Sequence, residues 1–131
     1  MRIITILCLV VISFSTCKNE GIDCHRTVTI YNNSNQRIIH AFKFTDPNKK
    51  CQLSGLVLDS GEYYEDVRRV CFESEVSTTR PYDLYIVDPS NYNDPYIFYS
   101  CDSIEIKNTV LKHYILTLDD LKQSNFTISY P

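Results

Sequence analysis

The stretch "TVTIYNNSNQRIIHAFKF", residues 27–44, decides the fold class. Thr27–Tyr31 is a run of β-branched and aromatic residues, with Val28 and Ile30 on one face, and it ends in a cluster of Asn and Ser. A second run, Ile38–Phe44, follows this cluster. Such runs are favoured in strands, whereas Asn and Ser are favoured in turns. The stretch therefore predicts two strands that form a hairpin with a loop of roughly six residues.

The remainder of the chain repeats this pattern of short strand-like runs separated by turn-forming residues, such as Asp-Ser-Gly at 59–61. Further predicted strands are Gly55–Leu58, Tyr63–Val67, Tyr82–Val87, Tyr96–Tyr99, Ser103–Ile106, Tyr114–Thr117 and Phe126–Tyr130. In the last of these strands, Phe126, Ile128 and Tyr130 alternate toward the interior.

One helix is predicted, directly before the last strand. The segment from Thr117 to Asp120 has the spacing of a capping box, with an Asp where Glu or Gln is usual. Acidic residues in the first turn and Lys122 near the end suit the helix dipole. Many short strands and a single short helix predict a mainly β fold, a small antiparallel β-sandwich that is Ig-like or related.

The N-terminus predicts export from the cytoplasm. Arg2 forms a minimal positive region, and Ile3–Phe14 is an apolar run with the length of the hydrophobic core of a signal peptide. A membrane-spanning helix needs about 20 apolar residues, so this run is too short to be one. We therefore expect residues 1–16 to be a signal peptide.

Cys17 follows this run directly, and its position resembles the lipobox cysteine of bacterial lipoproteins. The resemblance implies that the chain is cleaved before Cys17, which then carries a diacylglyceryl group and an N-terminal acyl chain such as palmitate. Phe14 and Thr16 depart from the commonest lipobox, and an ordinary secretory signal with an incidental cysteine is the alternative. Two or three acyl chains give lasting membrane attachment. The expected location is the bacterial cell envelope, with residues 17–23 as a tether to the outer membrane.

Removal of residues 1–16 would take away one of the 13 basic residues, Arg2, and none of the 16 acidic ones, which leaves a net charge of −4. A nucleic-acid-binding protein is expected to show a basic patch or stripe, so this class is disfavoured. The remaining chain suits one domain, residues 24–131. No motif indicates a cofactor.

Four cysteines remain after Cys17 and the signal peptide are set aside, and in an oxidising compartment they predict disulfides. Four cysteines allow three pairings, and spacing alone does not choose among them. A zinc site is the alternative, but the cysteines are widely spaced and no CxxC pair is present, so no metal is expected. The four are Cys24, Cys51, Cys71 and Cys101.

The C-terminal segment "VLKHYILTLDDLKQSNFTISYP", residues 110–131, resembles the closing motif of a large set of small, uncharacterised Bacteroidota lipoproteins. The motif runs from Leu-Lys-x-Tyr through Leu-(Glu/Asp)-Asp-Leu to an aromatic-Thr-Ile strand that ends in Tyr-Pro. "HRTVTIYNNS" at 25–34 and "RRVCFE" at 68–73 agree with the same family in order. Because Cys24 and Cys71 lie in these shared elements, the resemblance implies that they pair, which leaves Cys51 with Cys101. It implies no known activity.

No catalytic residue is predicted. A serine nucleophile needs a histidine and an orienting carboxylate, and no serine lies in a Gly-x-Ser-x-Gly elbow. His40 alternates with apolar residues and His113 lies in an apolar run, so both are expected to be packed or edge residues of strands. A small envelope hydrolase that uses scattered carboxylates and His113 is the alternative function. A concave pocket that brings His113 or two carboxylates within hydrogen-bonding reach would favour it.

The tyrosine-rich stretch "DPSNYNDPYIFYSC", residues 88–101, is the strongest candidate for a contact surface. Tyr92 and Tyr96 lie among Asp, Asn and Pro, as aromatic residues do in loops that stack on a sugar or contact a protein. Packing on the edge of the sandwich is the alternative. Asp102-Ser103-Ile104 also resembles the O-glycosylation site of exported Bacteroidota proteins. The sequence thus predicts a non-catalytic, lipid-anchored binding module for a protein partner or glycan, or an immunity-type inhibitor.

Overall fold

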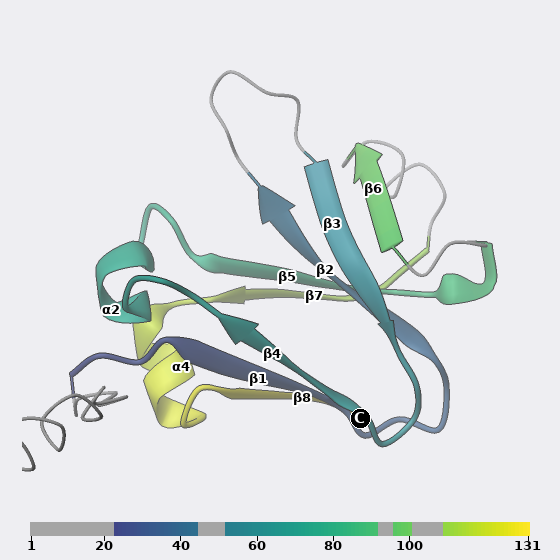
Figure 1. The fold of residues 1–131 in the computed structure, drawn as a ribbon, viewed down its shortest axis with the longest axis horizontal. Helices are drawn as coiled ribbons and strands as arrows, with labels where there is room; N and C mark the ends of the chain where they lie inside the picture. The colour runs from purple at the N-terminus through teal and green to yellow at the C-terminus, as the bar shows by residue number, and fades with distance from the viewer. Residues whose placement is uncertain (1–22, 45–51, 92–95, 101–108) are drawn as a thin grey trace, which may run out of the picture.

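The computed structural model describes residues 23–44, 52–91, 96–100 and 109–131, and it has the mainly β fold that the sequence predicts (Figure 1). Two sheets pack as a small β-sandwich, with short helices at one end. The elements are β1 (Thr27–Asn32), β2 (Ile38–Phe44), β3 (Gln52–Leu58), β4 (Tyr63–Val67), α2 (Phe72–Glu75), β5 (Tyr82–Val87), η2 (Pro89–Asn91), β6 (Tyr96–Ser100), β7 (Val110–Leu116), α4 (Leu118–Gln123) and β8 (Thr127–Tyr130).

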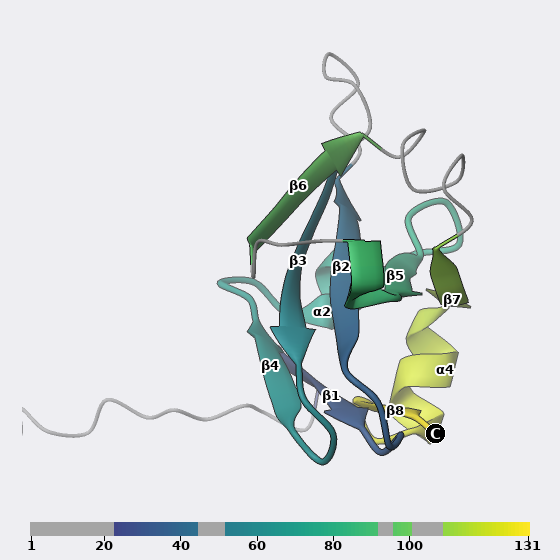
Figure 2. The ribbon, with the colours of Figure 1, turned by 90° about the vertical axis from the view of Figure 1, so that its right-hand side faces the viewer.

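The described strands form a three-stranded sheet in the order β4-β1-β8 and a five-stranded sheet in the order β6-β3-β2-β5-β7 (Figure 2). All neighbours pair in the antiparallel sense except β1 and β8, which are parallel. β4 and β8 are the edge strands of the smaller sheet, and β6 and β7 are those of the larger one. Because the smaller sheet has three strands and the larger one has five, it covers only part of the inner face of the larger sheet. Two cavities are lined by residues of β2 in the larger sheet and by Arg68, which follows β4 in the smaller one.

The predicted hairpin between the first two strands is wrong, because β1 and β2 belong to different sheets. Val28, Ile30 and Ile38 are all fully buried in one core cluster, in which β1 and β2 contribute from opposite layers. Asn32 stabilises the connection between β1 and β2. Its buried side chain donates hydrogen bonds to the backbone carbonyls of Leu58 and Asp59 and accepts one from the Ser34 N–H in the turn that follows β1. The alternating pattern fixed which face of each strand is apolar, but not which strand lies beside it.

The C-terminal helix is confirmed as α4. The Thr117 side chain accepts a hydrogen bond from the Asp120 backbone N–H, and the Asp120 carboxylate accepts from the Thr117 N–H at 2.8 Å. The sequence missed the one-turn helix α2, in which Phe72 is fully buried. Four residues are too few to show helical periodicity.

The last strand begins one residue later than predicted. Asn125 and Phe126 both have positive φ, 51° and 54°, where the chain leaves α4. Phe126 is nevertheless buried, and its ring stacks on that of His25 with centroids 3.9 Å apart. Ile128 is buried as expected, and Tyr130 is half-buried. Burial of the Phe126 ring offsets the strained backbone at this corner.

A disulfide joins Cys24, just before β1, to Cys71, at the start of α2, across a sequence separation of 47 residues. This is the pair that the resemblance implied. In the chain-entropy model a loop of this length contributes on the order of 4 kcal/mol to stability. Three other predicted modification and pairing sites lie outside the described residues, as does the predicted strand 103–106. These sites are Cys17, the pair Cys51 and Cys101, and Ser103.

Candidate functional site

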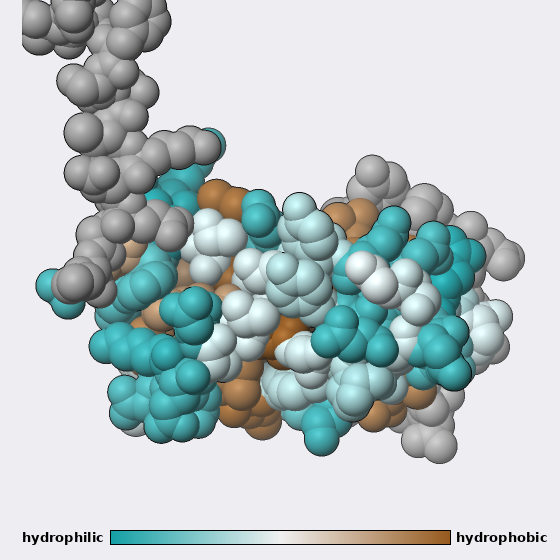
Figure 3. All heavy atoms as spheres, turned by 90° about the horizontal axis from the view of Figure 1, so that it is seen from below, coloured by the Kyte–Doolittle hydropathy of each residue, from teal (hydrophilic) through white to brown (hydrophobic). Residues whose placement is uncertain are grey.

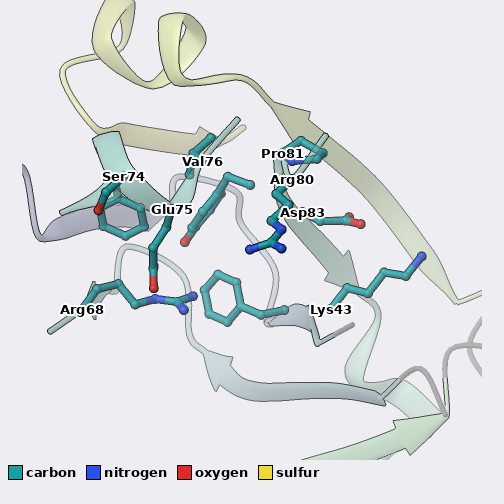
Figure 4. Close-up of a pocket in the computed structure, with 11 residues that line it drawn as sticks. Lys43, Arg68, Ser74, Glu75, Val76, Arg80, Pro81 and Asp83 are labelled. Carbon is teal, nitrogen blue, oxygen red and sulfur yellow. The ribbon is translucent and has the colours of Figure 1, made fainter. Parts of the chain in front are cut away.

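A cleft of about 380 Å³ lies beside α2 (Figure 4). We call it the α2 cleft. Its walls come from the end of β2, the residues that follow β4, α2 itself and the start of β5. Phe42 and Tyr82 contribute aromatic rings that contact each other edge to face, with centroids 5.6 Å apart. Tyr82 belongs to the hydrophobic core and Phe42 packs against it, so the cleft extends from the surface to the edge of the core.

A buried polar network forms one wall of the α2 cleft. The Arg68 side chain donates from Nε and Nη2 to the Asp66 carboxylate, at 2.9 Å to Oδ1 and 2.9 Å to Oδ2 respectively. The Tyr82 hydroxyl donates to the same carboxylate at 3.0 Å. Burial would lower the pKa of Arg68, but the hydrogen bonds and charge of Asp66 more than offset this effect and raise it. Burial, and then the Asp66 charge, raise the pKa of Tyr82, which stays protonated.

The mouth of the cleft carries charges of both signs. Figure 4 shows the Arg80 guanidinium turned into the cleft and the Glu75 carboxylate pointing toward Arg68. Within the described residues, no carboxylate forms an ion pair with Arg80, whereas Arg68 is already neutralised by Asp66. Among the described residues, Arg80 thus has no ion-pair partner.

A second cavity, of about 290 Å³, lies between β4 and the β2–β3 pair. We call it the His40 cavity. It shares Phe42 and Arg68 with the α2 cleft, so the two hollows adjoin. The His40 ring is 1% exposed and lies 4.2 Å from that of Tyr64 between centroids. Its Nδ1 is buried and has no hydrogen-bond partner among the described residues.

Burial lowers the pKa of His40 to about 4, although a hydrogen bond with the Leu56 backbone acts in the opposite direction. The imidazole is therefore neutral at pH 7. A neutral imidazole has one N–H donor and one bare nitrogen acceptor. The hydrogen bond with Leu56 raises the pKa of His40, so it favours the protonated imidazolium. A ring nitrogen that donates a hydrogen bond has this effect, so the nitrogen bound to Leu56 carries the proton. Nδ1 is then an acceptor without a donor.

Two further histidines pair with carboxylates outside these hollows. His113 Nε2 contacts Asp83 Oδ1, and its ring stacks on that of Tyr85 with centroids 3.9 Å apart. His25 contacts Glu73 through both its ring and its backbone N–H. Burial would raise the pKa of Glu73, but the hydrogen bonds from His25 outweigh it and lower this pKa. No serine or cysteine among the described residues is hydrogen-bonded to either ring.

The sequence-predicted contact residues are not brought to these hollows by any described contact. Tyr92 lies outside the described residues, and only the backbone of Tyr96 is described, as the first residue of β6. His40 is packed inside the sandwich and His113 lies on the edge strand β7, both as expected; the exposed His113 pairs there with Asp83. The described part of the chain contains no group of acidic, histidine or cysteine side chains that could hold a metal ion.

Sequence reasoning missed the residues that form the two hollows. One signal was present, because Tyr64 and Asp66 are two residues apart on a strand and so project from the same face, with Arg68 continuing the spacing. No such signal links Phe42 to Arg80, which meet only in the folded chain.

One further face of the described surface can be compared with these hollows. Figure 3 shows the molecule from below, where hydrophilic residues occupy both ends and weakly polar residues lie between them. The apolar residues on this face are scattered rather than joined in one patch. Within the described ranges, no helix has the length and apolar character needed to cross a bilayer. In comparisons with known proteins, no family model, curated protein or solved structure matches the chain.

Proposed function

We propose that this protein is a lipid-anchored module of the bacterial cell envelope that binds a ligand in the α2 cleft and the adjoining His40 cavity without transforming it. Cys17 carries the lipid, and residues 17–23 tether the sandwich to the outer membrane. The partner is a protein or a glycan, and an immunity-type inhibitor is one form that such a module takes.

The guanidinium of Arg80 above an aromatic wall is the observation that carries this proposal. Binding sites are typically concave, with apolar walls and a few well-placed polar groups that fix the orientation of the ligand. The α2 cleft has this composition, since Phe42 and Tyr82 supply the wall, and Arg80 and Glu75 supply polar groups at the mouth. Charges of both signs favour a ligand held by hydrogen bonds over a highly charged one.

One observation favours the alternative, a small envelope hydrolase. Asp83 lines the α2 cleft and is hydrogen-bonded to His113, which is the arrangement of an orienting carboxylate and a general base. A hydrolase of the serine or cysteine type also needs a nucleophile hydrogen-bonded to that base, and the described residues supply none. The pair also has a structural explanation, as a surface contact between neighbouring strands β5 and β7.

The anchor is tested by the intact mass of the membrane-extracted protein, with Cys17→Ala as the control. We expect the mass of residues 17–131 plus acyl chains, and release of the control protein from the membrane. An unlipidated mass for the wild-type protein would contradict the anchor.

The cleft is tested by placing a photoreactive amino acid at Ser74, which lines it, or at Ser124, an exposed residue at the end of α4. Irradiation of intact cells should give a defined adduct from position 74 and none from position 124, and Arg80→Ala should reduce the yield. Equal labelling at both positions, or no adduct at position 74, would contradict the cleft as the binding site. Alanine at both Tyr92 and Tyr96 tests, in the same assay, whether the 88–101 stretch contributes.

Binding and hydrolysis are separated by the mass of the recovered ligand. A ligand that is unchanged after incubation supports a binding module. Cleavage that is lost in His113→Ala would instead establish the hydrolase.

A further inference from the structure

The His40 cavity presents hydrogen-bonding groups without a net charge. Arg68 is neutralised by Asp66, with which it shares a bidentate contact, and His40 is a neutral imidazole. Ser54 and Tyr64 add hydroxyl groups to the lining. Neither an anionic nor a cationic ligand finds an unpaired countercharge here, so the cavity suits a neutral molecule.

The same groups disfavour an apolar ligand. His40 Nδ1 is already buried without a hydrogen bond, and a hydrocarbon that entered the cavity would desolvate Asp66 and Arg68 further. Burying a polar group without a partner is unfavourable. The ligand must therefore offer a hydrogen-bond donor to Nδ1 and acceptors to the outer part of the Arg68 guanidinium, which means several hydroxyl groups.

The aromatic side chains and the volume of the His40 cavity favour a ligand that is a single ring. Phe42 and Tyr64 both line the cavity, and flat rings of this kind pack against the C–H faces of a sugar. A volume of about 290 Å³ is at the lower end of the range for ligand pockets, which suits one ring rather than a chain of them.

Resting on the function proposed above, we propose that the His40 cavity binds one pyranose ring of a neutral glycan, with Nδ1 of His40 accepting a hydrogen bond from a ring hydroxyl. Because the cavity and the α2 cleft share Phe42 and Arg68, the next sugar of the chain lies in the cleft and contacts Arg80. The two hollows thus form adjacent subsites of one site.

The test uses the full-length chain in a detergent without a sugar headgroup. The probes are neutral hexoses (glucose, galactose, mannose and N-acetylglucosamine) and short oligosaccharides of each, followed by calorimetry and by the ¹⁵N resonance of His40 Nδ1. We expect at least one sugar to bind saturably and to shift this resonance. His40→Phe, which keeps a ring but removes the acceptor, should weaken binding about tenfold.

A matched pair of variants distinguishes the loss of a sugar contact from a general loss of folding. Tyr64 lines the cavity, whereas its neighbour Tyr63 is 56% exposed on the opposite face of β4. Tyr64→Ala should weaken sugar binding strongly, and Tyr63→Ala should leave it unchanged. Sugar binding that persists in both His40→Phe and Tyr64→Ala would overturn the proposal, and so would equal loss in Tyr63→Ala and Tyr64→Ala.

Two sources of the sugar are distinguished by Arg80→Ala. If the natural ligand is a glycan chain, oligosaccharides bind more tightly than the monosaccharide, and Arg80→Ala removes this difference. If it is a free sugar, the two probes bind alike and Arg80→Ala has no effect; the pyranose site then stands and its extension into the cleft fails.

Failure of this inference is distinguishable from failure of the proposed function. If no probe shifts the Nδ1 resonance, and that nitrogen only exchanges with water, the cavity holds an ordered water and the pyranose site is overturned. An adduct from position 74 in the photolabelling experiment would still support a binding module in that case. Absence of both the adduct and the shift would reject the two proposals together.

Discussion

Asn32 and His40 are both fully buried polar side chains, eight positions apart on consecutive strands, but they differ in what they bind. The Asn32 amide donates to three backbone carbonyls, and its oxygen accepts from both the N–H and the hydroxyl of Ser34. His40 keeps one ring nitrogen without a partner among the described residues. A satisfied buried group fixes structure, whereas an unsatisfied one calls for an explanation, of which a bound water or ligand is one.

The position of each residue agrees with this difference. Asn32 lies where the chain crosses between sheets, and its bonds tie the turn after β1 to the turn after β3. His40 lies beside a cavity between β4 and the β2–β3 pair. The first residue closes a corner of the sandwich, and the second lines an opening in it.

Asn32→Ala should therefore have the largest effect on stability. It leaves the Leu58 and Asp59 carbonyls and the Ser34 N–H without their partner, and the loss of several buried hydrogen bonds at about 1 to 3 kcal/mol each predicts destabilisation of about 4 kcal/mol. Chemical denaturation monitored by circular dichroism measures this change. The matched control is Asn33→Ala, because Asn33 is exposed and bonds only at the surface. A similar loss of unfolding free energy in both variants would show that the buried hydrogen bonds of Asn32 do not specifically stabilise this corner of the sandwich.

Acidification should destabilise the protein through His40. The folded-state pKa is about 4 and the unfolded value is 6.5, so the unfolded chain binds more protons between these two pH values. Stability is thus fully present above pH 6.5 and falls as the pH drops toward 4, by about 3 kcal/mol for His40 alone.

His40→Phe is the variant that isolates this contribution, because it does not titrate. Unfolding free energies measured at intervals from pH 7 to pH 4 should fall less steeply for the variant than for the wild-type protein. Glu73 adds to the loss only at lower pH, since its pKa is depressed below the ordinary carboxyl value. Parallel curves for the two proteins would mean that His40 is not held neutral by burial.

The contrast also shows what the sequence could and could not predict. Alternation of apolar residues predicted most strands, and the capping box predicted α4, because both signals are local. Partner strands were not predictable, since the pattern that places Val28 and Ile38 in the core is the same for a hairpin as for a crossover between sheets. The parallel addition of β8 to β1 depends on the whole chain and has no local signal.

The candidate site was harder to predict than the fold, for the same reason. His40 was correctly expected to be packed, but an unsatisfied nitrogen is a property of its neighbours on β3 and β4, not of its own strand. Arg68 and Arg80 resembled ordinary surface cations in the sequence. Only the structure distinguishes Arg68, which Asp66 neutralises, from Arg80, which is turned into the α2 cleft.

Gly55→Ala should have an intermediate effect and tests how rigidly the strand that carries His40 is held. A Cβ atom at position 55 would lie 2.5 Å from the backbone oxygen of His40 and 2.9 Å from Cγ2 of Ile39. Because the nearest atom belongs to the backbone of the paired strand, β2 and β3 would have to separate, and overpacking of this kind predicts destabilisation of about 2 kcal/mol. Thermal unfolding measures it.

Gly61→Ala is the control for a glycine that has space around it, because no atom lies within 4 Å of the added Cβ. Its positive φ of 80° makes the substitution strained for a different reason. Only Gly55→Ala should also shift the His40 Nδ1 resonance, since it alone disturbs the strand that carries the ring. An unchanged resonance in Gly55→Ala would show that the strands adapt without moving His40.

The smallest effect is expected for His40→Phe at pH 7, and it is the sharpest contrast with Asn32→Ala. The substitution removes a buried nitrogen that has no protein partner, and replaces it with carbon in an aromatic surrounding formed by Phe42 and Tyr64. The loss of the Leu56 backbone bond and the gain from removing an unsatisfied acceptor oppose each other, so the unfolding free energy should change by less than about 1 kcal/mol. Denaturant titration at pH 7 measures it. A large loss would mean that His40 stabilises the fold as Asn32 does, whereas a small change would mean that this buried, unsatisfied nitrogen contributes little to stability at pH 7.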